Sequence, residues 1–135
     1  MFDLTGKIAL VTGAQGGMGK AHAVALAGQG ATVIVTDLNK DSCALVADEI
    51  IAQGGSAAAY ALDVADESSI DSVISDVVGK FGHLDILVNN AGIFRPKPAL
   101  EVTRQEWEAT LSVNLMGQFL CAQRAAKEMA KNAWG

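Results

Sequence analysis

The fold is decided by the stretch Ile8-Ala9-Leu10-Val11-Thr12-Gly13-Ala14-Gln15-Gly16-Gly17-Met18-Gly19, in which an apolar run passes directly into a glycine cluster. The apolar run predicts a buried strand, and the alanine-rich segment from Lys20 to Gln29 predicts a helix that ends at Gly30. Glycine in the turn between them permits unusual backbone dihedrals and close backbone approach. Free N–H groups at the helix start would suit a pyrophosphate, whereas the alternative is a tight strand-to-helix turn without a ligand.

The same alternation of short apolar runs and helical periods continues along the chain. Further strands are predicted at 31–36, 57–62 and 84–88, and further helices at 41–53, along the face Ile70, Val73, Ile74, Val77 and Phe81, and from the capping box Thr103-x-x-Glu106 to about Asn132. Near-continuous apolar strands separated by helices indicate a parallel sheet covered on both faces. We therefore predict an α/β fold, a Rossmann-type doubly wound parallel sheet in the strand order 3-2-1-4 with three α/β/α layers. One domain over residues 1–135 accounts for the chain.

Composition and charge argue against several classes of protein. Half of the 135 residues are apolar and 19% are charged, which is typical of a globular domain. The net charge of -5 argues against nucleic-acid binding. No apolar stretch approaches the roughly 20 residues of a membrane helix, and no secretory signal opens the chain, so we expect a cytoplasmic protein without membrane contact. Cys43 and Cys121 have no Cys or His at ligand spacing, so we expect reduced thiols and no metal site.

An acidic residue follows the second predicted strand. Asp37 stands 24 residues after Gly13, where a carboxylate can hold both ribose hydroxyls of an adenosine. The same carboxylate would repel the 2′-phosphate of NADP, so NAD is the expected cofactor and NADP the less favoured one. Glycines and an acid in these places would also suit a methyltransferase that binds S-adenosylmethionine.

Four motifs together resemble the short-chain dehydrogenase/reductase family. They are Thr12-Gly13-x-x-x-Gly17-x-Gly19 after the first strand, Asp63-Val64 after the third, Asn89-Asn90-Ala91-Gly92 after the fourth, and Asn114 inside the last helix. Their order and context match the N-terminal half of that family. The asparagine turn and Asn114 weigh against the methyltransferase alternative.

The resemblance implies an NAD(P)-dependent oxidoreductase that moves a hydride between nicotinamide and an alcohol or ketone. The implied cofactor-binding residues are Gly13, Gln15, Gly17, Met18, Gly19, Asp37, Leu38, Asp63, Val64, Asn90, Ala91 and Gly92. Asn114 is the implied catalytic residue, which in the family supports a helix kink and binds a water of the proton relay. Simpler alternatives stay open: Asp63 as an acid at a helix start, Asn90 as a turn residue, and Asn114 as a core amide.

Other polar residues carry weaker signals. The loop Phe94-Arg95-Pro96-Lys97 follows the fourth strand, so it either walls a substrate pocket or is an ordinary ordered loop. His22 and His83 have no partner in the sequence that would make a triad or a metal site, so we expect them to be structural or exposed.

The rest of the family's catalytic set is missing from this chain. The family's Ser and Tyr-x-x-x-Lys pair lie on and beyond a fifth strand, and the chain stops at Trp134-Gly135, where that strand would begin. The one tyrosine, Tyr60, has Val64 rather than Lys four residues on. We therefore expect the chain to be truncated, inactive alone, and prone to pairing with other chains at its fourth strand. A non-catalytic dinucleotide-binding fragment is the alternative function, and a homo-oligomer through the last helix is expected at full length.

Overall fold

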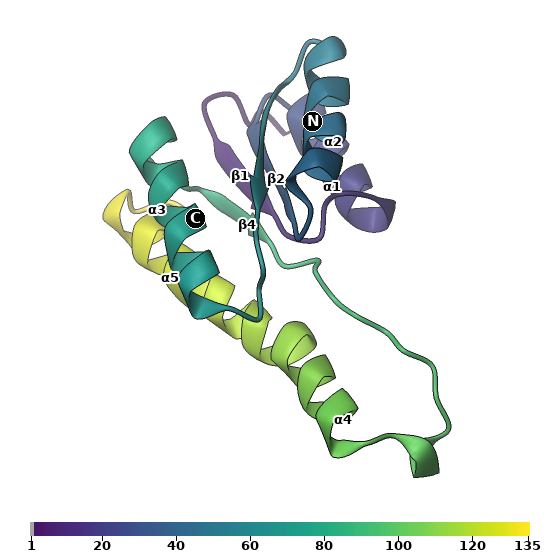
Figure 1. Cartoon of the computed structure of the whole chain (residues 1–135). Helices are drawn as coiled ribbons and strands as arrows, with labels where there is room; N and C mark the ends of the chain where they lie inside the picture. Colours follow the sequence, from purple (N-terminus) through teal and green to yellow (C-terminus); the bar gives the residue numbers. More distant parts are fainter. Residues whose placement is uncertain (1) are drawn as a thin grey trace.

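The computed structural model of the chain describes residues 2–135 (Figure 1). Its strands are β1 (Ile8–Val11), β2 (Thr32–Asp37), β3 (Ser56–Ala61) and β4 (Ile86–Val88). They form one parallel sheet in the order β3-β2-β1-β4, which confirms the predicted strand order. Within residues 2–135, no helix is both long and apolar enough to cross a membrane.

Helices cover both faces of this sheet and form the predicted three layers (Figure 1). The helices are α1 (Gly17–Gly28), α2 (Lys40–Ala52), α3 (Glu67–Phe81), α4 (Arg104–Leu111) and α5 (Gln118–Lys131). Strand side chains alternate between the layers: Leu10 and Ile34 pack toward α3 and α5, whereas Val11 and Val35 pack toward α1 and α2. Because both faces are buried, the strands are apolar at almost every position, which explains their unbroken apolar runs.

Two boundaries differ from the prediction by more than one residue. The first helix begins at Gly17 rather than at Lys20, because the last glycines of the cluster form its first turn. The fourth strand is Ile86–Val88 rather than 84–88. Just before this strand, the carboxylate of Asp85 accepts the backbone N–H of Ile8 at 2.8 Å, so a side chain binds that N–H.

Asp85 lies inside the molecule, although it precedes β4, an edge strand of the sheet. It is 3% exposed, and its Oδ1 lies 3.5 Å from Lys7 Nζ. Nε2 of His83 lies 3.0 Å from Asp85 Oδ2 and 3.0 Å from the carbonyl oxygen of Gly6. These contacts give His83 a structural role at the amino-terminal edge of the sheet, where they link β1 to the segment before β4.

The last predicted helix, 103–132, is divided by a π-helical segment at Ser112–Gly117. It starts as predicted with a capping box: Thr103 Oγ1 accepts the Glu106 N–H at 3.2 Å, and the Glu106 carboxylate accepts the Thr103 N–H at 2.8 Å. Figure 1 shows that α4 extends away from the sheet, whereas α5 lies beside α3. The π-helical segment is the joint between these two parts.

Gly117 ends the π-helical segment at a close contact. A Cβ added there would lie 2.6 Å from the backbone oxygen of Val64 and 3.0 Å from its Cβ. Only glycine allows the helix to approach the loop after β3 this closely. The contact brings two segments of the carboxyl-terminal edge together, and this edge carries the candidate site.

Candidate functional site

A cleft of about 410 Å³ opens at the carboxyl-terminal ends of the strands. Its lining residues are Gly13, Gln15, Gly16, Asp37, Leu38, Leu62, Asp63, Val64, Asn90, Ala91, Gly92 and Ile93. Most of them are residues that the sequence predicted for a cofactor site, drawn from the loops after all four strands. Gly16, Leu62 and Ile93 were not predicted, although each adjoins a residue that was. Of the predicted residues, Gly17, Met18 and Gly19 lie in the first turn of α1, and Asn114 lines a neighbouring cavity.

The loop after β1 and the asparagine turn after β4 are bound directly to each other. Thr12 Oγ1 accepts the backbone N–H groups of Asn90 and Ala91, each at 3.0 Å. The side-chain amide of Asn90 donates to the carbonyl oxygens of Thr12 at 3.0 Å and Gly13 at 2.9 Å. Both N–H bonds of that amide are thus used within the protein. These bonds go to the first loop, so they differ from the simpler alternative of a turn residue that bonds its own backbone.

Two glycines are required by the same contact. Gly13 has a φ of +64°, and a Cβ there would lie 2.8 Å from the Cα of Ala91. A Cβ at Gly19 would overlap the carbonyl oxygen of Gly13 and would lie 2.6 Å from Asn90 Nδ2. These glycines allow the α1 helix, the first loop and the asparagine turn to pack in contact.

Gly16 and Gly17 differ from that pair, because they face open space. Apart from the adjoining residues and the backbone of α1 itself, no described atom lies within 4 Å of a Cβ added at either position. Gly17 still favours glycine, since its φ of +54° lies in the left-handed region. Packing within residues 2–135 therefore does not explain the absence of side chains here, which leaves room for a ligand to approach the backbone.

The start of α1 also differs from the starts of the other helices that follow strands or loops. Side chains cap α2, α3 and α4, with Asn39, Asp66 and Thr103 as the acceptors. Within the described residues, α1 has no side-chain cap and no acid in its first turn. The first N–H groups of a helix have no intrahelical acceptor, so those of α1 remain available as donors at the cleft.

Two carboxylates lie at the cleft, after β2 and after β3. Asp37 Oδ1 accepts the Leu38 N–H at 2.8 Å, and Oδ2 lies 3.4 Å from the Gln15 nitrogen. Asp63 Oδ1 accepts the Ala65 N–H at 2.9 Å. Asp66 rather than Asp63 caps α3, so the helix-start alternative for Asp63 does not describe its position.

Asn114 fixes the loop that follows β4. Its Oδ1 accepts the Ile93 N–H at 2.7 Å, and its Nδ2 donates to the Ile93 carbonyl oxygen at 2.8 Å. The Asn114 amide therefore binds both backbone polar groups of Ile93, as the backbone of a neighbouring β-strand would. Ile93 lines both the cleft and the smaller cavity that Asn114 lines, so this pair forms the wall between them.

Two further residues, Asn89 and Thr12, hold segments together at this edge of the sheet. The sequence did not predict a role in the site for either of them. Asn89 Nδ2 donates to the carbonyl oxygen of Gln118 at 3.0 Å, which ties the end of β4 to the start of α5. Among the described residues, Asn89 Oδ1 is buried without a hydrogen-bond partner. The sequence signals that could have indicated these roles are the position of Thr12 immediately before the glycine cluster and that of Asn89 within the asparagine turn.

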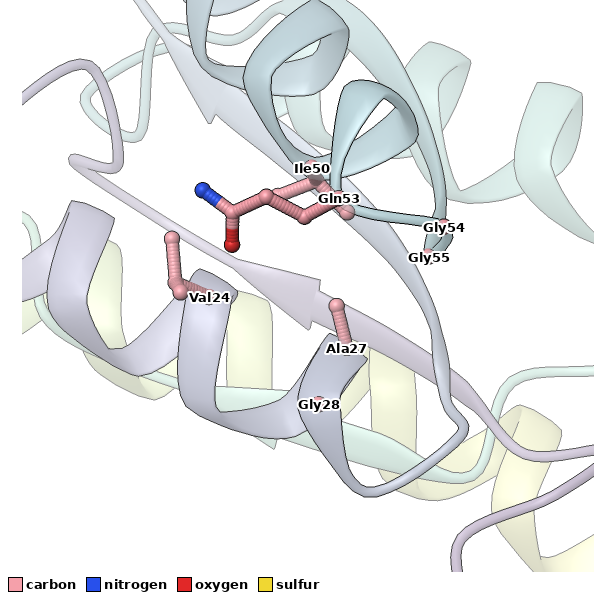
Figure 2. A pocket seen from close by; sticks show the side chains of 7 residues that line it. All are labelled: Val24, Ala27, Gly28, Ile50, Gln53, Gly54 and Gly55. Atoms are coloured by element: carbon pink, nitrogen blue, oxygen red, sulfur yellow. The ribbon is translucent and has the colours of Figure 1, made fainter.

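A second cavity, of about 270 Å³, lies at the opposite edge of the sheet between the ends of α1 and α2 (Figure 2). Its lining residues are Val24, Ala27, Gly28, Ile50, Gln53, Gly54 and Gly55. Figure 2 shows the Gln53 side chain reaching toward Val24 on the facing helix. None of these lining residues is ionisable, so this cavity offers no group for acid–base chemistry or for pairing with a charged ligand.

The described residues offer no candidate metal centre. No group of three or more His, Cys, Asp or Glu side chains within residues 2–135 could hold a metal ion. Burial, and then the charge of Asp37, raises the pKa of the buried Cys43 thiol to about 11. Burial likewise raises the pKa of Cys121 to about 11, against an opposing effect of Arg124. Neither thiol is a nucleophile at neutral pH.

Comparisons with known proteins agree with this geometry. The family model described as short chain dehydrogenase matches residues 7–135, and the chain belongs to that family. The D-threitol dehydrogenase of Mycolicibacterium smegmatis is 42% identical over 134 residues, which cover 99% of this chain and 52% of that protein. A 3-oxoacyl-(acyl-carrier-protein) reductase of Synechocystis is 43% identical over 136 residues, with coverages of 100% and 55%.

Solved structures show the same relation. A short-chain type dehydrogenase/reductase from Mycobacterium marinum superposes with a TM-score of 0.95 at 39% identity, covering 99% of this chain and 53% of that one. A metagenomic short-chain oxidoreductase in complex with NADP gives a TM-score of 0.92 at 34% identity, with coverages of 97% and 60%. The chain thus spans about half the length of the curated relatives that it matches.

Proposed function

We propose that the cleft binds NAD and that the protein is an oxidoreductase acting on an alcohol or a ketone. The observation that carries the proposal is the uncapped start of α1, whose preceding residue, Gly16, lines the same cleft as Asp37. Free N–H donors suit a pyrophosphate. A carboxylate that follows the second strand, 24 residues after Gly13, suits a ribose diol. When bound, the nicotinamide would accept or supply the hydride.

The residues present fit such a cofactor. The backbone of Gly13, Gln15, Gly17, Met18 and Gly19 would hold the pyrophosphate and part of the adenosine, and no side chain at Gly16 or Gly17 obstructs approach. Asp37 and Leu38 would hold the adenosine ribose, Asp63 and Val64 the adenine, and Asn90, Ala91 and Gly92 the ribose next to the nicotinamide. Since the amide hydrogens of Asn90 are bound to the first loop, its contribution is to shape that end of the cleft.

Selectivity for NAD over NADP is proposed from the charge of Asp37. Two like charges about 4 Å apart repel by about 4 kcal/mol at an effective dielectric constant of 20, less after screening by salt. Lys40 is the nearest cation along the chain, and it is exposed in the first turn of α2. Gly16 supplies no cation where a 2′-phosphate would approach.

Asn114 is proposed to act on the reaction as a positioning residue. Its amide holds Ile93 by two hydrogen bonds, and Ile93 walls the cleft at the Gly92 end. The π-helical segment supplies the local distortion that lets an amide inside a helix reach the neighbouring loop, and such segments are frequent at functional sites.

Equilibrium binding tests the proposed cofactor. Fluorescence titration should give a dissociation constant for NADH at least tenfold lower than that for NADPH, and no saturable binding of S-adenosylmethionine. The Asp37→Ser variant should narrow the NADH-to-NADPH ratio, whereas Asp41→Ser, which removes an acid from α2 outside the cleft, should leave it unchanged. NADPH binding as tight as NADH binding in the wild type would contradict the selectivity, and preferential binding of S-adenosylmethionine would contradict the function.

We also propose that the full-length protein forms a homo-oligomer through α4 and α5. Trp107, Leu111, Leu115 and Phe119 recur every four residues and remain 59%, 39%, 65% and 58% exposed. An apolar stripe of this kind on a helix suits a second copy of itself. Light scattering should show a dimer or larger species that Leu115→Glu dissociates. A monomer in the wild type at micromolar concentration would contradict the assembly.

A further inference from the structure

A small cavity of about 190 Å³ adjoins the cleft on the far side of Ile93. Its lining residues are Ile93, Phe94, Arg95, Lys97, Val102, Glu106, Trp107, Thr110 and Asn114. The loop after β4 forms one wall and α4 forms the other. Ile93 also lines the cleft, so this cavity lies next to the proposed nicotinamide end of the cleft, and a substrate that spans both would have one end at the nicotinamide.

The loop is held across the cavity at both of its ends. Asn114 binds Ile93 at the start, and Lys97 Nζ lies 3.0 Å from each carboxylate oxygen of Glu106 at the other end. Arg95 lies between these two anchors. The loop therefore presents the Arg95 guanidinium to the cavity from a fixed backbone segment.

The charges that line the cavity do not cancel. Lys97 and Glu106 neutralise each other as an ion pair. The backbone N–H of Thr103, followed by Lys97, lowers the pKa of Glu106 to about 2, so its carboxylate stays ionised and paired. Arg95 has no carboxylate within 4.0 Å among residues 2–135, which leaves one positive charge unpaired.

The surrounding walls are partly apolar. Phe94, Val102 and Trp107 contribute apolar surface to the lining. A guanidinium presents a planar fork of N–H donors that matches a carboxylate or a phosphate group.

We propose that this cavity receives the anionic end of the substrate and that Arg95 recognises its carboxylate or phosphate group. The inference rests on the proposed function, since it takes the neighbouring cleft as the nicotinamide site. It narrows the substrate class from alcohols and ketones in general to those that carry an anionic group a few atoms from the reacting carbon. Lys97 and Glu106 fix the loop, and Arg95 provides the recognition.

The test uses Trp107, which lines the cavity, as a fluorescent reporter of binding. The Trp134→Phe substitution removes the other tryptophan, which lies over Lys7 Nζ in another part of the molecule. The probes are levulinate, a keto carboxylate, dihydroxyacetone phosphate, a keto phosphate, and methyl levulinate, an uncharged ketone. They are titrated at low ionic strength without nucleotide.

We expect the dissociation constant of at least one anionic probe to be tenfold or more below that of methyl levulinate. Preference for levulinate would identify a carboxylate site, and preference for dihydroxyacetone phosphate would identify a phosphate site. Arg95→Gln should remove the preference, whereas Lys127→Gln, which removes a cation from α5 outside this cavity, should retain it. Equal binding of charged and uncharged probes, or a preference that survives Arg95→Gln, would overturn the inference.

A parallel NADH titration keeps this result separate from the proposed function. Arg95 does not line the cleft, so Arg95→Gln should bind NADH as the wild type does. NADH binding together with equal binding of all three probes would overturn the anion site alone. If the wild type does not bind NADH but still prefers the anionic probes, the cofactor proposal is overturned and the anion-binding cavity remains supported.

Discussion

Replacing Gly19 by alanine should damage the candidate site through packing alone. The added methyl group would overlap the carbonyl oxygen of Gly13 and would lie 2.9 Å from the Cα of Ala14. Both contacts are with backbone atoms, so no side-chain rotation relieves them. The methyl group would also lie 2.6 Å from Asn90 Nδ2, whose two hydrogen bonds join the first loop to the asparagine turn.

The expected destabilisation follows from three contributions. Loss of two hydrogen bonds removes about 2 kcal/mol at about 1 kcal/mol each, and forcing a methyl group into packed backbone adds about 1–3 kcal/mol. Alanine inside a helix returns about 0.5–1 kcal/mol relative to glycine. Gly19→Ala should therefore lower the free energy of unfolding by about 2–4.5 kcal/mol, a large fraction of the roughly 5–15 kcal/mol typical of a domain.

Urea denaturation provides the assay, with Gly28→Ala as the matched control. Gly28 lies in the same helix, and a methyl group added there would have no described atom within 4 Å outside its own helix. The control should be as stable as the wild type or slightly more stable, whereas Gly19→Ala should unfold at a clearly lower urea concentration. Equal midpoints for the two variants would refute the close packing between α1, the first loop and the asparagine turn.

Three further changes test other parts of the structure. Gly117→Ala should lower the free energy of unfolding by about 1–3 kcal/mol, because the added methyl group collides with the loop after β3. Its control, Gly79→Ala in α3, faces open space and should raise the free energy of unfolding by up to about 1 kcal/mol. Equal urea midpoints for the two variants would contradict this difference. Gly17→Val should abolish NADH binding and, because of its φ of +54°, also lower the melting temperature; a folded variant with unchanged NADH affinity would remove the first turn of α1 from the site. The pKa of Glu106 is lowered from 4.5 to about 2, first by the Thr103 N–H, so its stabilising effect is present above pH 4.5 and is lost as the pH falls toward 2. Glu106→Gln should flatten that acid limb of the stability curve, and an unchanged limb would contradict the assignment.

The sequence predicted the strand order and which residues would share one cleft, because both depend on local patterns. Unbroken apolar runs such as Ile8–Val11 require burial on both faces, and only parallel strands covered by helices provide it. Residues that follow successive parallel strands meet at one edge of the sheet. Gly13 and Asp37 could therefore be placed in one cleft without knowledge of their contacts.

The features that the sequence did not predict depend on contacts between distant residues. The apolar stripe Trp107, Leu111, Leu115 and Phe119 keeps the same spacing through Ser112–Gly117. The sequence therefore predicted a continuous helix there, and only Asn114 and Gly117 indicated a local irregularity. The partner of Asn114 is a backbone segment 21 residues away, which no periodicity specifies. The burial of Asp85 was likewise not predicted, because its partner, the Ile8 N–H, belongs to another strand.

Mapping the bound nucleotide onto backbone amides tests the central claim most directly. A nitrogen-15-labelled chain titrated with NADH should show its largest chemical-shift changes at the amides of Gly17, Met18 and Gly19, with smaller changes at Leu38 and Val64. The amides that line the cavity between the ends of α1 and α2, at Gly28, Gly54 and Gly55, should keep their positions. Largest changes in that second set, or saturating NADH that leaves the first turn of α1 unshifted, would contradict a dinucleotide site at the carboxyl-terminal edge of the sheet.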